Sequence, residues 1–396
     1  MNPSASGWIR KHFSYFLSCT ASDVASEEAL YLRFRESGFI YGSSICTLTD
    51  AESEQLKWTE EEKTKINLFD ALVYTYYDTI VNPTEQDCIQ TIINFYEFLN
   101  TKKPFFTISI GKDTPYTILE KIIQRRIQTN EPLLKKNFSH LITNALLYLD
   151  VLAFDHYLIT DNDPCDYVTR LEATIGNTIW LALREKEETA VYDELLIKLF
   201  ESSIRYNEDL RTEAQTITAL GLNRYNQPLE QRYLLDLSCL AVWDDLHVDD
   251  SEYEFIKTLG KALQLPKQEV IQSLQFVQEF VKTHKDRIAY LNYSNPVKHF
   301  YKQTSRAVST LVLRNKKRLI KEIVQSKDLV FLLGQSTSRS LTVAEKKQVK
   351  TQLMDICKSI PSLAIFLLPG GGILLPLLVK FIPQLLPSAF NENMVS

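Results

Sequence analysis

Apolar side chains recur at intervals of three or four residues over most of this chain, which is the spacing that places them on one face of an α-helix. One short stretch, residues 103–109 (KPFFTIS), is rich in β-forming residues, but a lone strand cannot make a sheet, so we expect an extended linker there. The pattern therefore predicts an all-α, multi-helical protein. The expected helices cover residues 59–80, 84–100, 116–126, 133–159, 167–186, 190–203, 230–242, 252–263, 267–284, 296–314, 316–324 and 343–358, with one more helix and a linker over 207–227.

Local sequence features support several of these helices. Thr59 followed by Glu62 is the pattern of a capping box, in which each side chain bonds the other's backbone N–H at the start of a helix. At the N-terminus, Trp8, Ile9 and Phe13 fall on one side of a first helix, together with Phe16. We expect that face to pack on the main body of the protein.

Breaks in the pattern divide the chain into four regions. They are an N-terminal helical domain at 1–228, a helical module at 229–295, a basic helical segment at 296–358 and an apolar segment at 359–396. The predicted architecture is two helical bodies followed by an apolar tail that prolines and glycines interrupt. A weak internal echo links Leu149-Asp150 with Leu235-Asp236, since each pair lies in a helix that runs into an acidic turn.

Composition narrows the function class. Only 11 of the 396 residues are glycine, which disfavours barrels and glycine-rich nucleotide folds. The six cysteines are dispersed without a CxxC pair, so a reducing compartment fits better than a disulfide framework. No GxSxG, P-loop, HExxH or dinucleotide motif occurs, and the six histidines are scattered. The sequence predicts a protein that is not an enzyme and carries no cofactor, with a divalent cation as the one exception considered below.

Charge is unevenly distributed. The whole chain carries −5, but residues 296–358 contain fourteen lysines and arginines against four acidic residues, a local net charge of +10. Such a segment favours an anionic partner, either lipid headgroups or the phosphates of RNA. The predicted basic patch consists of Lys316, Lys317, Arg318, Lys321, Lys346, Lys347, Lys350 and Lys358.

The densest acidic cluster lies at 243–254 (WDDLHVDDSEYE). Asp245, Asp249 and Glu252 supply carboxylate oxygens of the kind that bind Mg²⁺ or Ca²⁺, although the spacing is not that of an EF-hand. The alternative is that Asp249 caps the following helix and Glu252 closes a capping box. Residues 233–265 around this turn resemble the TerB-like helical domain of tellurite resistance, with Asp245, Val248 and Glu252 at the matching positions and Leu246 where that family has glycine.

The last part of the chain differs from everything before it. Residues 359–379 contain no charge, and their number is close to the ~20 residues that a helix needs to span a bilayer. Glycines and prolines break the run, which leaves three arrangements open: a kinked single span, a re-entrant hairpin turning at 370–372, or a hairpin packed on the protein's own helices. The residues that define this segment are Pro361, Pro369, Gly370, Gly371, Gly372, Pro376, Lys380, Pro383 and Pro387.

Residues 340–390 resemble the opening of the LETM family, the leucine-zipper/EF-hand transmembrane proteins. The shared pattern begins with an aspartate six residues before a proline and continues with an apolar stretch. It ends with the motifs LLP, Lys-Phe and LPS-x-F. The matching residues are Asp355, Pro361, Pro369, Leu375-Pro376, Lys380-Phe381, Pro383, Leu386-Pro387-Ser388 and Phe390. The overall arrangement is similar to bacterial LETM-related biofilm-associated proteins. It implies a non-enzymatic scaffold held at the inner membrane with its bulk in the cytoplasm, linked to cation homeostasis or biofilm formation, with membrane lipid and unidentified proteins as partners. The alternative is a soluble, cytoplasmic adaptor whose basic face binds the ribosome or RNA.

Overall fold

The computed structural model describes residues 2–23, 27–48, 58–102, 113–127, 144–160, 163–184, 216–242, 248–284, 305, 308–309, 311–313, 315–360, 363 and 371–382. The predicted linker at 103–109 and the predicted helix at 190–203 lie outside these ranges. Over the described residues the chain forms helices and no strand, which confirms the all-α prediction.

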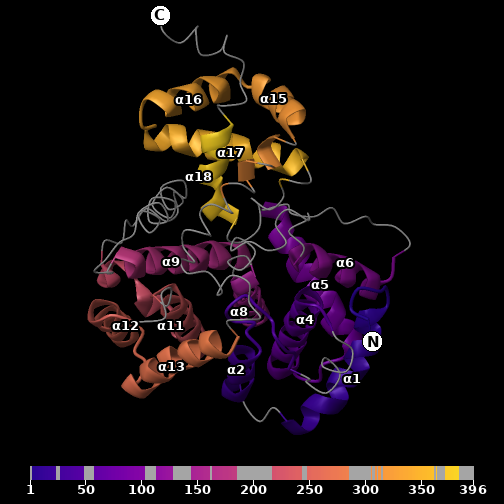
Figure 1. Cartoon of the computed structure of the whole chain (residues 1–396). Coiled ribbons are helices and arrows are strands. Elements are labelled where there is room, and N and C mark those ends of the chain that lie inside the picture. The colour runs from indigo at the N-terminus through magenta and orange to yellow at the C-terminus, as the bar shows by residue number, and fades with distance from the viewer. Residues whose placement is uncertain are drawn as a thin grey trace, which may run out of the picture.

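The N-terminal half supplies seven of the described α-helices (Figure 1). They are α1 (Trp8–Asp23), α2 (Glu27–Glu36), α4 (Glu60–Thr79), α5 (Glu85–Lys102), α6 (Pro115–Ile127), α8 (Leu147–Ile159) and α9 (Pro164–Arg184). The predicted apolar face of α1 is buried: Trp8, Ile9, Phe13 and Phe16 are all nearly inaccessible to solvent. The capping box predicted at Thr59 and Glu62 is present at the start of α4.

The helix expected over 133–159 is interrupted where the structure describes it. A turn at Leu146 precedes α8, and the Tyr233 hydroxyl donates a hydrogen bond of 2.5 Å to the carbonyl oxygen of Ala145. That carbonyl is therefore bonded by a side chain from a distant helix. In a continuous helix the Ala145 carbonyl would accept a backbone N–H, whereas here a tertiary contact supplies its hydrogen-bond donor.

Two short 3₁₀ helices, η2 (Ile217–Leu220) and η3 (Leu222–Arg224), lead into α11 (Pro228–Val242), α12 (Asp250–Ala262) and α13 (Lys267–His284). The bounds of α13 agree with the helix predicted at 267–284. Helix α11 packs against α9 as well as against α12 and α13, so the predicted module at 229–295 is joined to the N-terminal helices through a shared core (Figure 1).

Buried ion pairs hold the central helices together. Arg126 of α6 binds Asp150 of α8 through two hydrogen bonds, Nε to Oδ2 at 2.6 Å and Nη2 to Oδ1 at 3.0 Å, and the Tyr96 hydroxyl donates to the same Oδ2. Arg35 of α2 binds Asp236 of α11 in the same bidentate way, at 2.7 and 2.9 Å. There the Tyr31 hydroxyl adds a bond of 2.7 Å to Oδ2.

Asp150 and Asp236, the two aspartates of the sequence echo, therefore have the same surroundings. Each is a fully buried helical carboxylate that accepts two bonds from an arginine and one from a tyrosine. Bidentate arginine and an additional hydroxyl satisfy most of the carboxylate's acceptor capacity, which is what a buried charge requires.

The C-terminal helices lie together at one end of the molecule (Figure 1). They are α15 (Lys316–Val324), α16 (Lys327–Ser338), α17 (Val343–Ser359) and α18 (Gly371–Phe381), of which α15, α16 and α17 pack on one another. The predictions at 316–324 and 343–358 are confirmed, whereas α16 was not predicted. A capping box of Thr342 and Glu345 starts α17.

Candidate functional site

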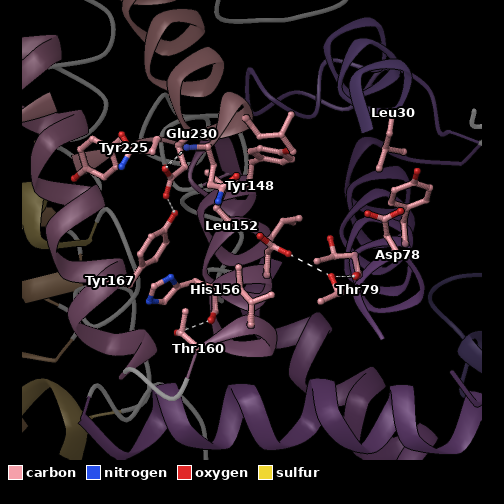
Figure 2. A pocket seen from close by; sticks show the side chains of 18 of the residues that line it. Leu30, Asp78, Thr79, Tyr148, Leu152, His156, Thr160, Tyr167, Tyr225 and Glu230 are labelled. Carbon is pink, nitrogen blue, oxygen red and sulfur yellow. Dashed lines mark hydrogen bonds between the residues drawn. The ribbon is translucent and has the colours of Figure 1, made fainter. Parts of the chain in front are cut away.

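A candidate site is a cavity of about 590 Å³ among the N-terminal helices and α11. Its walls come from α2, the end of α4, one side of α8, the start of α9, the segment that leads into α11 and the first turn of α11. A volume of this size falls within the range of small-molecule sites. Figure 2 shows His156, Tyr167 and Tyr225 on one side of the cavity and Asp78 and Thr79 on the other.

Aromatic side chains form much of the lining. Tyr148, Tyr167 and Tyr225 are buried, and Phe34 and Tyr74 also line the cavity. The His156 ring stacks on Tyr167 with a centroid distance of 4.5 Å and an interplanar angle of 15°. Burial and, secondarily, the nearby Arg170 lower the pKa of His156, so its imidazole is neutral at pH 7.

Two carboxylates face the same space from different helices. Glu230 at the start of α11 is 7% exposed and accepts hydrogen bonds from the Tyr167 hydroxyl at 2.6 Å and the Gln227 backbone N–H at 3.2 Å. Asp155 of α8 accepts only a long bond of 3.4 Å from the Thr79 hydroxyl among the described residues. Thr79 also donates to the Thr75 carbonyl at 2.8 Å, so its single proton is better placed for that partner.

Burial raises the pKa of both acids. For Asp155 desolvation is the main cause and the charge of Asp78 adds to it, while the Thr79 bond opposes the rise. For Glu230 desolvation again dominates, and the charge of Asp155 contributes against the bonds from Tyr167 and Gln227. Arg170 and Arg224 also line the cavity, but both are exposed to solvent, and the Nε of Arg224 donates to the Gly221 carbonyl.

None of these cavity residues was predicted as a site. Asp155 and His156 are adjacent in the sequence, and adjacency alone does not predict a site. The structure places both on the cavity wall, on the same turn of α8. The sequence clue was a pair of ionisable residues in a helix with mostly apolar neighbours.

The predicted cation site at the acidic turn is only partly described, since Asp245 lies outside the described residues. Asp249 and Glu252 form the capping box of α12: Asp249 Oδ1 accepts from the Glu252 N–H at 2.8 Å, and Glu252 Oε2 accepts from the Asp249 N–H at 3.0 Å. The capping alternative is therefore confirmed. No three potential metal-ligating side chains cluster within the described ranges, and cation binding at this turn stays a prediction.

The cap can be separated from a cation site by two substitutions. Asp249→Ala removes the acceptor for the Glu252 N–H, so we expect it to lower the free energy of unfolding by about 1 kcal/mol in urea titrations. Asp249→Ser keeps a capping oxygen but removes the carboxylate, so we expect nearly full stability. If Mg²⁺ or Ca²⁺ stabilised the wild type but neither the serine nor the alanine variant, the carboxylate would be serving a cation as well.

The predicted basic patch lies on α15 and α17. Lys316, Lys317, Arg318 and Lys321 are exposed on α15 and have no ion-pair partner among the described residues. On α17, Lys347 and Lys358 are exposed, Lys346 and Lys350 are half-buried, and Lys358 pairs with Asp355 at 2.8 Å. The α15 cluster is therefore the part of the patch best presented to an anionic partner.

Of the apolar segment, the structure describes residues 359–360, 363 and 371–382. Helix α18 begins at Gly371 and contains Gly372 and Pro376, while Pro361, Pro369, Gly370, Pro383 and Pro387 lie outside the described residues. Its 11 residues correspond to about 16 Å of helix, roughly half of a bilayer's hydrocarbon thickness. Within the part of the chain that the structure describes, no helix has both the length and the apolar character needed to cross a membrane.

The side chains of α18 indicate where it rests in this structure. Leu377, Leu378 and Val379 are buried, as is Ile382 just after the helix, whereas Lys380 is exposed. Pro376 lies inside the helix rather than ending it, at the cost of one N–H donor to the preceding turn. The sequence left three arrangements open, and burial of these side chains fits a tail that packs on the protein's own helices.

Comparison with known families bears on this end of the chain. Residues 341–395 match the family model described as LETM1-like, RBD. The match covers Leu341, α17, α18 and most of the tail, and it supports the LETM resemblance seen in the sequence. No curated protein and no solved structure matches the chain.

Proposed function

We propose that this protein is a non-enzymatic, membrane-associated helical scaffold of the LETM type. The observation that carries the proposal is the LETM1-like match over residues 341–395, which includes the uncharged stretch. The scaffold would reside at the inner membrane with its helical bulk in the cytoplasm. The links to biofilm formation, to cation homeostasis and to a TerB-like module at 229–295 belong to the same proposal.

Two surface features support membrane association. The four basic side chains of α15 can attract anionic headgroups, at about 1 kcal/mol for each charge near the bilayer surface. Large apolar side chains of the same C-terminal region are also exposed, namely Leu313, Val324, Phe331 and Val343. Basic and apolar side chains together are the combination that holds proteins at the interface of anionic membranes.

The buried side chains of α18 set a condition on the proposal. If the tail enters lipid, α18 must release Leu377, Leu378 and Val379 from their present contacts. The transfer is between two apolar surroundings, so the hydrophobic term changes little. The membrane-bound form would then differ from the described one mainly at the tail.

The competing function uses the same cations. The exposed α15 cluster suits RNA phosphates as well as lipid phosphates, and the buried part of α18 favours a soluble adaptor that binds the ribosome or RNA. Lipid is the preferred partner because the same region also exposes apolar side chains that suit a bilayer interface.

Fractionation of cells that express the full chain distinguishes the two functions. We expect the protein in the membrane pellet, and we expect deletion of residues 360–396 to move most of it to the supernatant. A combined Lys316→Glu, Lys317→Glu, Arg318→Glu and Lys321→Glu variant should float poorly with phosphatidylglycerol vesicles, while Lys257→Glu on α12 serves as a basic-to-acidic control. A full-length protein that stays in the supernatant and sediments with ribosomes would favour the adaptor instead.

A further inference from the structure

The cavity bounded by α2, α4, α8, α9 and α11 has a lining that the membrane proposal does not use. Its inner wall combines buried aromatic rings with hydrogen-bond acceptors, while the two arginines that line it are solvent-exposed. We propose that this cavity binds a small organic compound carrying a primary ammonium group, with Asp155 and Glu230 as its anionic partners and tyrosine rings around it.

The acceptors come from separate elements that the fold brings together. Asp155 is on α8, Glu230 opens α11, and Asp78 lies near the end of α4. Glu230 already receives two hydrogen bonds, but among the described residues Asp155 receives only the 3.4 Å contact with a threonine whose proton has a nearer acceptor. A half-buried carboxylate without a committed donor is a group that a cationic ligand would stabilise.

The aromatic walls suit the same ligand. Tyr148, Tyr167 and Tyr225 line the cavity, and an ammonium group that reaches the face of a tyrosine ring gains cation–π attraction. The neighbouring His156 is an additional acceptor: its Nε2 is buried and has no hydrogen-bond partner among the described residues, and the ring is neutral at pH 7. Neutral imidazole avoids adding a positive charge that would repel the ligand.

The size of the cavity excludes a bare metal ion as its natural occupant. A volume of about 590 Å³ is far larger than one ion needs, and no metal-ligating triad was found among the described residues. Arg170 and Arg224 also line the cavity, and both are exposed to solvent. An extended diamine therefore suits both the size of the cavity and its spread of carboxylates.

The buried carboxylate of Asp155 also lowers the stability of the folded protein. Burial raises the pKa of Asp155 above its ordinary value, so ionisation of this carboxyl lowers the stability of the folded state as the pH rises above about 4. Asp155→Asn removes that charge, and we expect the variant to keep or to increase the thermal stability of the protein at pH 7. A site that costs stability in the absence of ligand is a common sign of function.

Calorimetry on the full-length protein tests the proposal with putrescine as the probe and 1,4-butanediol as its uncharged counterpart. We expect putrescine to bind and butanediol to give no saturable heat. Asp155→Asn should weaken putrescine binding about tenfold to a hundredfold, which is the loss expected for one hydrogen-bonded charge, and Asp155→Glu should restore most of it. Glu97→Gln, at an exposed carboxylate on α5, is the matched control and should bind like the wild type.

Several results would overturn the proposal. They are the absence of saturable putrescine binding at 10 mM by the folded wild type, equal affinity for putrescine and butanediol, or equal affinity of the wild type and a folded Asp155→Asn variant. Circular dichroism and thermal melting establish folding for each variant. Should Asp155→Asn fail to fold, Tyr167→Phe removes the Glu230 partner without a charge change, and a loss of putrescine affinity in that variant tests the same cavity.

Discussion

Asp150→Ala is expected to reduce the free energy of unfolding by about 3–5 kcal/mol, the cost of breaking a buried ion pair by removing one partner. The substitution leaves the guanidinium of Arg126, which is 2% exposed, without its counterion. It also removes the acceptor of the Tyr96 hydroxyl. Both uncompensated groups would remain in the core between α6, α8 and α5.

Urea denaturation followed by circular dichroism measures this effect, and two further variants establish its cause. Asp113→Asn breaks the exposed ion pair with Lys121 and should cost less than about 1 kcal/mol. The double variant Arg126→Met/Asp150→Leu should recover much of the lost stability, since it leaves no unpaired charge. A single variant no less stable than Asp113→Asn would show that the buried pair contributes nothing to the fold.

Gly38→Ala is the second substitution with a large expected effect, a loss of about 3 kcal/mol. Gly38 follows α2 with φ of +77°, a conformation that costs an L-residue about 1–2 kcal/mol. A Cβ there would collide with the Ser43 carbonyl oxygen and lie 2.7 Å from Cζ of Phe280, so overpacking adds to the strain. The turn also directs the chain just after Arg35, whose ion pair depends on the position of α2.

Gly176→Ala provides a control of opposite sign. Gly176 lies in the middle of α9, and a Cβ there would have no atom within 4 Å. Alanine is favoured over glycine in a helix interior, so this variant should gain about 0.5–1 kcal/mol. Thermal unfolding midpoints of the two variants measure both effects. Shifts of Gly38→Ala and Gly176→Ala in the same direction would contradict the role given to the positive φ of Gly38.

The helices were predictable because their causes are local. The capping boxes at Thr59–Glu62 and Asp249–Glu252 each lie within four residues, and both are present in the structure. Helix α16 was missed although Ser326 caps it and Leu329, Leu332 and Leu333 repeat at helical spacing. The apolar pattern of α16 is weak because the helix has only 12 residues and a polar last turn, and because basic residues flank it.

The cavity and the buried pairs could not be predicted because their causes are distant in the sequence. Tyr167 meets Glu230 over 63 positions, and Arg126 meets Asp150 over 24, so only the packing of helices decides these contacts. Asp150 and Asp236 were noticed for their similar sequence, but nothing in that similarity indicated an arginine and a tyrosine as partners. The cation and membrane sites rest on residues that are partly outside the described ranges, and they stay predictions.

The pairing of Arg35 with Asp236 has a consequence for how the protein is made. The two residues are 201 positions apart in the chain. Because ribosomes add about 5–20 residues per second, Asp236 is synthesised roughly 10–40 seconds after Arg35. During that interval the nascent chain cannot close around α2 without trapping a lone charge. The core around Arg35 is therefore expected to close only after α11 has been synthesised.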